Sequence, residues 1–414
     1  MVYVQSSDGV ALMPTLRYGK VRRLLRDKKA VVVKMMPFTV RLTYNTTAYT
    51  QEVSLGVDAG SKYIGISATT ESKELFSAQI EVRTDIVKLI ADRREHRDSR
   101  RSRKTRYRPA RFNNRRKRKG WIAPSIRQKV EAHLKAIRMV HFILPVKRIT
   151  IEAAQFDEQL IKNPCISGEQ YQQGEQLGFW NVREYVLCRD DHVCQNCKGK
   201  SKDKILNVHH LESRKTGGNA PNNLITLCKT CHKALHQGEI ELRKKRGTNF
   251  RDATIMNVMR MEVYNRAKLE FRNVGMTYGY ITKHLRVLHD VPKSHNSDAF
   301  CVAGNLFSRR SDSFIKGRFI ARHTRALHVY NPRKGGIRRR AIAPHWIGKS
   351  RLQRYDSVIW NKKKCFIYGS TNGRPIIRDI DGNLVAKTPS VNANTVIFKS
   401  RNKGLLMQVF TLKN

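Results

Sequence analysis

The stretch VSLGVDAGSKYIGISATT, residues 53–70, carries the pattern on which the fold class depends. Its β-branched residues alternate along the chain and glycines interrupt them, which predicts two apolar strands joined by a turn. Asp58 lies at the end of the first strand, and the small residues after it would let a phosphate approach closely. An acidic side chain inside an apolar strand is rare unless it is paired or binds a metal. Asp58 is therefore a candidate site residue, although alone it could be a turn residue.

Two further segments place acidic residues in comparable positions. RITIEAAQF, residues 148–156, puts Glu152 in another apolar strand, where it could also be a strand-end ion pair. KSHNSDAFCVAG, residues 293–304, puts His295 and Asp298 three residues apart, on one face at the start of a helix. Together the three segments predict a site assembled from distant parts of the chain. We expect the oxygen ligands Asp58, Glu152 and Asp298 to bind two Mg²⁺ ions there.

The charge of the chain indicates a polyanionic partner. Lys and Arg number 81 against 33 acidic residues, which gives a formal net charge of +48. Such an excess is costly to a free protein through self-repulsion, and nucleic acid is the commonest polyanion in a cell. Residues 93–119 hold 15 Lys and Arg against 2 acidic residues, and the remaining excess is spread along the chain. This distribution favours a large enveloping interface over a single basic tail. The candidate nucleic-acid-binding residues are Arg93, Arg94, Arg97, Arg100, Arg101, Arg103, Arg106, Arg108, Arg111, Arg115 and Arg116.

Length and composition exclude several classes of protein. A chain of 414 residues is long enough for two to four domains, each with its own core. A hydrophobic content of 40% is typical of a folded protein. No run approaches the roughly 18 apolar residues of a membrane helix, and the N-terminal sequence lacks a secretory signal. We therefore expect a cytoplasmic protein with no membrane partner.

Four of the eight cysteines form two C-x-x-C pairs. Cys194 pairs with Cys197, and Cys228 pairs with Cys231, with 30 residues between the pairs. In an intracellular chain this spacing predicts a tetrahedral, structural zinc site rather than disulfides. The alternative is a set of four reduced core cysteines.

The segment NVHHLESRKTGGNAPNNLITLCKTCHKALH, residues 207–236, resembles the HNH nuclease family. In that family a β-ribbon and a helix hold one divalent metal against a phosphate. The resemblance implies that His209 and His232 bind a Mg²⁺ ion, that His210 is the general base, and that Asn223 orients the ribbon and aligns the base. A neutral imidazole can take a proton from water near pH 7. Successive strand residues point to opposite faces, so the histidine doublet is expected at an irregular strand end. The alternative is a zinc knuckle that only binds DNA.

In their order along the chain, the three acidic segments resemble a split RuvC nuclease with an RNase-H-like fold, whose catalytic residues would be Asp58, Glu152, His295 and Asp298. The alternative is the same fold with an inactive site. The order of segments resembles that of IscB, a family of transposon-encoded RNA-guided nucleases. In that order a RuvC piece is followed by an arginine-rich helix, a second RuvC piece, an HNH insert and a third RuvC piece. ALMP at residues 11–14 resembles the PLMP signature of the N-terminal domain of that family.

The IscB resemblance implies a multidomain α/β chain. A split RNase-H-like RuvC core would carry an arginine-rich bridge helix, an inserted zinc-stabilised ββα-metal HNH domain and a small β-rich C-terminal domain. The expected limits are a PLMP-like domain at 1–51, RuvC pieces at 52–83, 121–163 and 253–315, the bridge helix at 84–120, linkers at 164–179 and 241–252, the HNH domain at 180–240, and the C-terminal region at 316–414.

The same resemblance implies an RNA-guided double-strand DNA endonuclease that recognises a short target-adjacent motif. The HNH site would cut the guide-paired strand, and the RuvC site would cut the displaced strand. The partners would be a structured omega-type guide RNA and target double-stranded DNA, with one protein chain in the ribonucleoprotein. Two other functions stay open: a protein-guided, homing-type HNH endonuclease, and a non-catalytic RNA- or DNA-binding protein.

Overall fold

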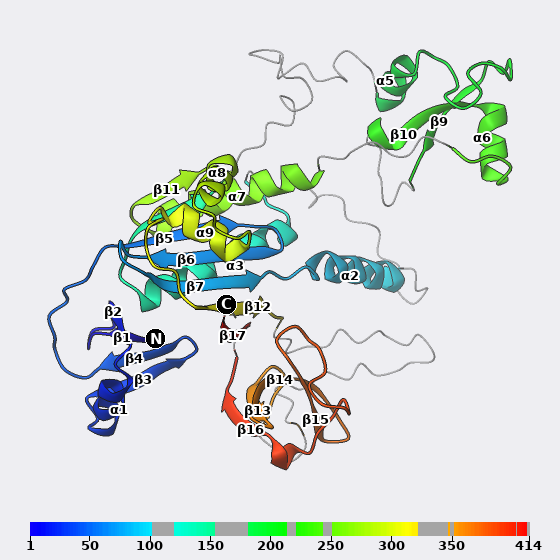
Figure 1. Ribbon diagram of the computed structural model, residues 1–414. Helices are drawn as coiled ribbons and strands as arrows, with labels where there is room; N and C mark the ends of the chain where they lie inside the picture. Colours follow the sequence, from blue (N-terminus) through cyan, green and yellow to red (C-terminus); the bar gives the residue numbers. More distant parts are fainter. Residues whose placement is uncertain are drawn as a thin grey trace. The chain divides into compact units, whose positions relative to one another are not determined.

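The computed structural model divides the chain into two compact units (Figure 1). The sheet unit comprises residues 1–155 and 256–414, and the inserted unit comprises residues 156–255. Arg103, Arg106, Arg108, Arg111, Arg115 and Arg116 lie outside the described residues, as does the expected linker at 164–179. The structure describes residues 1–101, 120–153, 181–212, 221–242, 251–321, 347, 352–402 and 404–411.

A seven-stranded mixed sheet forms the centre of the sheet unit, with strand order β11-β8-β5-β6-β7-β12-β17. The stretch at 53–70 forms the antiparallel pair β5–β6, as predicted, and β7 continues it in antiparallel pairing. On the other side of β5, strands β8 and β11 are parallel, and β12 is parallel to β7. The strands are β5 (Val53–Ala59), β6 (Tyr63–Thr69), β7 (Glu74–Glu81), β8 (Val146–Glu152), β11 (Val274–Thr277), β12 (Ser313–Phe319) and β17 (Leu405–Thr411).

Side-chain alternation along β5 gives the sheet two different faces. Leu55 and Val57 belong to a large core that also holds Leu134 of α3 and Val263 of α7. The alternate residues of β5, which include Gly56 and Asp58, face helix α9. The helices of this unit are α2 (Ile86–Arg101), α3 (Pro124–Ile143), α7 (Arg251–Glu270), α8 (Gly279–Leu288) and α9 (His295–Ala303). One strand therefore contributes both to the core and to the site.

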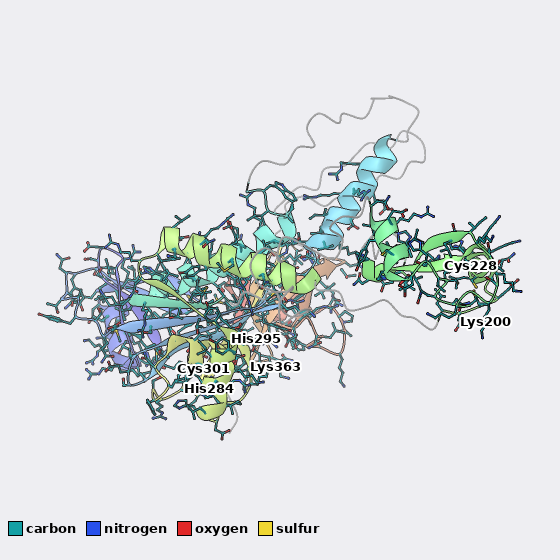
Figure 2. The ribbon with its side chains drawn as sticks, turned by 90° about the horizontal axis from the view of Figure 1, so that it is seen from above. Lys200, Cys228, His284, His295, Cys301 and Lys363 are labelled. Carbon is teal, nitrogen blue, oxygen red and sulfur yellow. The ribbon has the colours of Figure 1, made fainter. Side chains whose placement is uncertain are left out.

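Helix α9 approaches the sheet so closely that two positions beneath it require glycine. A Cβ atom on Gly56 would lie 2.0 Å from the Ala299 carbonyl oxygen, and one on Gly65 would lie 1.8 Å from the His295 carbonyl oxygen. Real Cβ atoms do not come this near to backbone, so a larger residue would displace the helix. The helix contacts β5, β6, β7 and β8, and Figure 2 shows its residues His295 and Cys301, with His284 on α8.

A separate small sheet forms the N-terminal part, with strand order β2-β1-β4-β3. The ALMP sequence lies in β2, and the apolar stretch at 30–42 forms two antiparallel strands. Gln5 joins this sheet to α3 by donating from Nε2 to the Phe142 carbonyl at 2.8 Å. The elements are β1 (Val2–Gln5), β2 (Ala11–Thr15), α1 (Tyr18–Arg26), β3 (Ala30–Met35) and β4 (Phe38–Leu42).

The C-terminal region contains a four-stranded antiparallel sheet with order β15-β14-β13-β16. Its strands are β13 (Ser357–Trp360), β14 (Lys363–Thr371), β15 (Arg374–Arg378) and β16 (Ile397–Ser400). The expected limit between 315 and 316 falls inside β12, and β17 returns to pair with β12 in the seven-stranded sheet. The last hundred residues are therefore not a self-contained module. No helix in the described part of the chain is both long and apolar enough to cross a membrane.

We predict that Gly56→Ala destabilises the protein by about 1–3 kcal/mol, because the added methyl group overpacks against helix backbone that cannot rotate away. The matched control is Gly19→Ala on the exposed surface of α1, where nothing lies within 4 Å of the added Cβ. The control should be neutral or stabilising, since alanine favours helix over glycine. Denaturant midpoints measure both changes, and equal midpoints for the two variants would contradict the close approach.

Candidate functional sites

The inserted unit is a β-hairpin followed directly by a helix. Strand β9 (Leu206–His210) pairs with β10 (Leu224–Cys228) in antiparallel register, and α6 (Lys229–His236) begins where β10 ends. Helix α5 (Val182–Arg189) packs against β10. In the described part of this unit, one small core cluster holds five buried residues, and three of them are cysteines.

The four predicted zinc ligands converge. The Sγ atoms of Cys194, Cys197, Cys228 and Cys231 all lie within 4.8 Å of one another. A tetrahedral zinc site with Zn–S bonds of about 2.3 Å spaces its sulfur atoms about 3.8 Å apart. The Cys197 and Cys228 sulfurs lie 3.8 Å apart, so the donor set fits zinc. Hydrogen bonds from Ser201 lower the pKa of the Cys197 thiol to about 6, whereas burial raises the pKa of the Cys231 thiol to about 12, so the geometry of the four sulfurs carries the zinc assignment.

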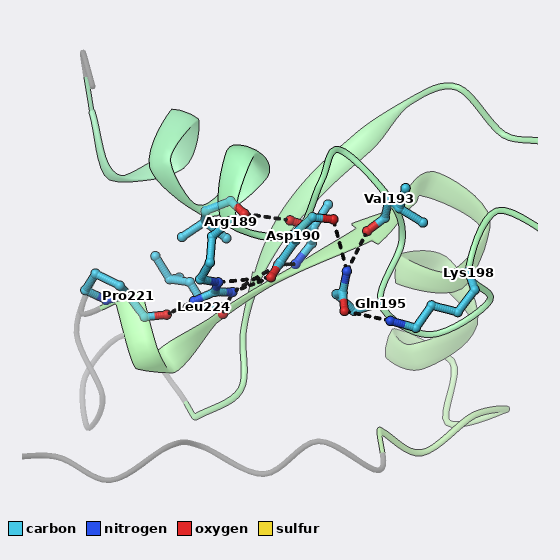
Figure 3. A network of polar contacts seen from close by, with 9 residues as sticks. Arg189, Asp190, Val193, Gln195, Lys198, Pro221 and Leu224 are labelled. Carbon is cyan, nitrogen blue, oxygen red and sulfur yellow. Dashed lines mark hydrogen bonds and ion pairs between the residues drawn. The ribbon is translucent and has the colours of Figure 1, made fainter. Parts of the chain in front are cut away.

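An ion pair between the buried Asp190 and the more exposed Arg189 fixes the end of α5 to the hairpin, and no local sequence pattern marks it (Figure 3). The Asp190 carboxylate accepts from the Thr226 backbone amide at 2.9 Å and from the Arg189 guanidinium. Arg189 also donates to the Pro221 and Leu224 carbonyls at 2.7 and 2.9 Å. Burial alone would raise the pKa of Asp190, but the hydrogen bonds from Arg189 and Thr226 leave it below its usual value.

Three histidines form a second cluster in the inserted unit. Candidate nitrogen ligands of His209, His232 and His236 lie within 4.8 Å of one another. His232 and His236 are one turn apart on α6, with ring centroids 4.6 Å apart, and each ring centroid lies 5.2 Å from that of His209. Burial and the neighbouring histidines lower the pKa of His209 and of His232, which favours the neutral, metal-binding imidazole. The sequence reasoning missed His236, although its four-residue spacing from His232 was a usable signal.

The histidine doublet lies in a regular strand, which corrects the expectation of an irregular strand end. His209 pairs with Ile225 and His210 pairs with Leu224, without a bulge. Because successive residues of a strand face opposite ways, only His209 joins the cluster with α6.

Asn223 closes the hairpin just beyond the doublet. Its side chain is fully buried, accepts from the Glu212 backbone amide at 2.9 Å and donates to the Glu212 carbonyl at 3.1 Å. The Asn223 carbonyl also accepts from the Leu211 amide at 2.8 Å. Asn223 therefore holds the backbone that directly follows His210.

The sheet unit brings the three acidic segments together. Asp58 and Glu152 are register partners near the carboxyl ends of the parallel strands β5 and β8. His295, in the first turn of α9, has its Nδ1 atom 2.6 Å from Asp58 Oδ2, and Asp298 follows on the same helix face. Burial, followed by the charge of Asp58, raises the pKa of both Glu152 and Asp298. The hydrogen bond to Asp58 raises the pKa of His295.

Two arginines that the sequence did not single out hold these carboxylates. Arg260, which is only 9% exposed on α7, donates from Nε to the Ala59 carbonyl at 3.0 Å and lies 3.4 Å from Glu152 Oε1. Arg286 on α8 lies 3.2 Å from Asp298 Oδ1. In a chain so rich in arginine, nothing in the sequence distinguishes these two from the others.

The arginine-rich helix is described only in part. Arg93, Arg94 and Arg97 are exposed on α2, as a nucleic-acid-binding role requires. Arg100 and Arg101 end that helix, and their side chains lie outside the described part of the structure.

Comparison with protein families identifies two domains. The model of the RRXRR protein family matches residues 2–174, and the model of the HNH endonuclease family matches residues 194–238. No curated protein matches the chain. The chain thus contains an RRXRR domain and, within the inserted unit, an HNH endonuclease domain that includes both the thiol cluster and the histidine cluster.

We predict one tightly bound zinc per chain, held by the four cysteines, whose removal unfolds the inserted unit while the sheet unit stays folded. Metal analysis and limited proteolysis test this, with Cys231→Ser as the damaging variant. Cys188→Ser is the control, because Cys188 is exposed and outside the cluster. Folded protein that retains a protected inserted unit without zinc would contradict the assignment.

Asp190→Asn should lower the stability of the inserted unit by about 1–3 kcal/mol at neutral pH, because a charged acceptor of several buried hydrogen bonds is lost. The pKa of Asp190 is lowered on folding, so its contribution is present above the unfolded value and is lost as pH falls through the folded one. The difference from wild type should therefore shrink below about pH 4. Asp191→Asn, at the exposed neighbouring position, is the control.

Proposed function

We propose that this chain is an RNA-guided double-strand DNA endonuclease of the IscB type. The observation that carries the proposal is an acidic cluster, built from three distant segments on a folded sheet, in the same chain as an HNH endonuclease domain. An RRXRR domain is typical of the N-terminal part of IscB-like proteins, which supports the same conclusion.

In the HNH domain we assign His209, His232 and His236 as the ligands of a divalent metal. When bound, this ion stabilises the charge that builds on the phosphate. Three imidazoles suit a transition-metal ion better than the Mg²⁺ expected from the sequence, since Mg²⁺ prefers oxygen ligands. His210 takes the proton from the attacking water as general base, and Asn223 keeps the base in position by holding the backbone after it.

In the sheet unit Asp58, Glu152 and Asp298 would supply oxygen ligands for two Mg²⁺ ions, and such ions would lower the pKa of water and stabilise negative charge on the phosphate. The chemistry of these residues fits such ions, because Mg²⁺ prefers oxygen ligands and a bound cation would counter the burial and the charge of Asp58 that raise the pKa of Glu152 and of Asp298. His295 orients Asp58 through Nδ1, and its half-exposed ring can move a proton between the site and solvent.

Nucleic-acid binding accounts for the charge of +48. The exposed arginines of α2 contact phosphates of a guide–target duplex, while base pairing with the guide reads the sequence. The HNH site cuts the guide-paired strand, and the carboxylate site cuts the displaced strand. Sequencing the nucleic acid that copurifies separates the alternatives: one discrete structured RNA supports guidance, random RNA supports a non-catalytic binder, and none supports a homing-type enzyme.

Single substitutions should convert the enzyme into two nickases of opposite strand preference. His210→Ala removes the general base and should slow cutting of the guide-paired strand by about 10²–10⁴-fold. Asp58→Ala removes a carboxylate of the two-metal site and should stop cutting of the displaced strand. Each variant should bind target as wild type does. A strand-resolved cleavage gel, with DNA matched to the copurifying RNA, measures both rates.

His236→Ala serves as a comparison within the HNH site. It removes a metal ligand but not the base, so excess metal should restore its activity in part, whereas His210→Ala should not respond to metal. Loss of both cuts in His210→Ala would show that the two sites do not act independently, and the proposed two-nuclease function would be wrong.

A further inference from the structure

Two tyrosines at the start of α8 form an exposed stacked pair. Tyr278 is the N-cap residue and Tyr280 follows in the first turn, with ring centroids 5.9 Å apart and ring planes 18° apart. Tyr278 is 40% exposed and Tyr280 is 72% exposed. Aromatic rings usually bury their faces in a core, so a stacked pair with this much free surface calls for a ligand.

The backbone places this pair beside the acidic site. Strand β11 is parallel to β8, and its last residue, Thr277, is the register partner of Glu152. Between the tyrosines, a Cβ on Gly279 would lie 3.1 Å from Glu152 Oε1. Thr282, one turn further along α8, lies near enough to the same carboxyl group to lower its pKa. The turn that carries the tyrosines therefore forms one wall of the acidic site.

The charge around the pair suits a nucleic-acid strand. Lys283 is exposed three residues after Tyr280, so the two lie on the same face of α8 and can contact a base and its phosphate. A stacking surface accepts any unpaired base, because every base has a flat π-face, whereas the faces of bases in a duplex are already stacked.

We propose that Tyr278 and Tyr280 form a stacking platform for an unpaired base of the displaced DNA strand, next to the phosphate that is cut at the acidic site. The proposal rests on the function proposed above. It adds a binding subsite that tolerates all four bases and that sets the position of the cut along the strand.

A coupling experiment tests the platform with the purified ribonucleoprotein and DNA matched to its RNA. One abasic site is moved through the displaced strand around the mapped cut. With wild-type protein, one position should slow cutting of that strand by about 5- to 150-fold, the range expected for loss of one stacked base. Tyr278→Leu with Tyr280→Leu should be slow on intact DNA, and the abasic site should cause no further loss, because both changes remove one contact.

Two double variants control for side effects. Tyr278→Phe with Tyr280→Phe keeps the rings and should behave as wild type. Tyr44→Leu with Tyr49→Leu removes two tyrosines of comparable exposure, 41% and 91%, from the linker that follows β4, and should keep the wild-type abasic profile. Photocrosslinking of a strand with 5-iododeoxyuridine at the sensitive position should label Tyr278 or Tyr280 even in Asp58→Ala protein, where no cut occurs.

If the abasic site slowed the leucine double variant by the same factor as it slows wild type, the proposed platform would be wrong. The platform would also be wrong if the leucine double variant cut both DNA strands more slowly by the same factor. That result would indicate that the exposed face of α8, which includes Val287 and Leu288, contacts protein instead. These results are distinguishable from failure of the proposed function, which would appear as continued cutting of the displaced strand by Asp58→Ala.

Discussion

The close contact between α9 and the central sheet determines the geometry of the acidic site. Where Gly56 and Gly65 lack a side chain, the carbonyl oxygens of Ala299 and His295 occupy the space of a Cβ atom. The helix therefore rests on the strands by its backbone, and its first turn is held above the end of β5. This contact brings His295 to 2.6 Å from Asp58, a residue 237 positions earlier in the chain. The opposite face of β5 is filled with Leu55 and Val57, so the strand that carries the site is also anchored in the largest core.

The two arginines explain how a buried acidic cluster is tolerated in the folded protein. Carboxylates that lie close together in a partly buried place repel one another, and their pKa values rise. Arg260 offsets the negative charge of Glu152, and Arg286 offsets that of Asp298. His295 pairs in the same way with Asp58. The described residues thus include three chemically distinct donor sets: carboxylate oxygens on the sheet, imidazole nitrogens of the histidine cluster on β9 and α6, and thiols of the four clustered cysteines. Hard, intermediate and soft donors select different metals, so the sites need not compete for one ion.

The sequence predicted the local parts of this structure better than the long-range ones. The strands of residues 53–70, the acidic positions at 58, 152 and 298, and the two C-x-x-C pairs follow local periodicity or spacing, and the structure contains all of them. The pairing of β12 with β17 joins segments about ninety residues apart, which periodicity does not encode. Arg260 contacts Glu152, which lies 108 residues earlier in the chain, and no local sequence pattern marks this arginine. His236 was within reach, because its helical spacing from His232 is local.

The cluster of four cysteines and the cluster of three histidines are joined through the start of α6. Cys228 is the N-cap of this helix, Cys231 lies in its first turn, and His232 is the next residue. A zinc ion on the four thiols would therefore fix the first turn of the helix that presents His232 and His236 to His209. Among the described residues, the core cluster beside α6 holds five buried residues, three of them cysteines, so little apolar packing there could position the helix by other means. A zinc ion on the four thiols would thus do for the inserted unit what the glycine contact does for the sheet. In both units the start of a helix is held at the end of a strand, and this attachment sets the geometry of the candidate site residues.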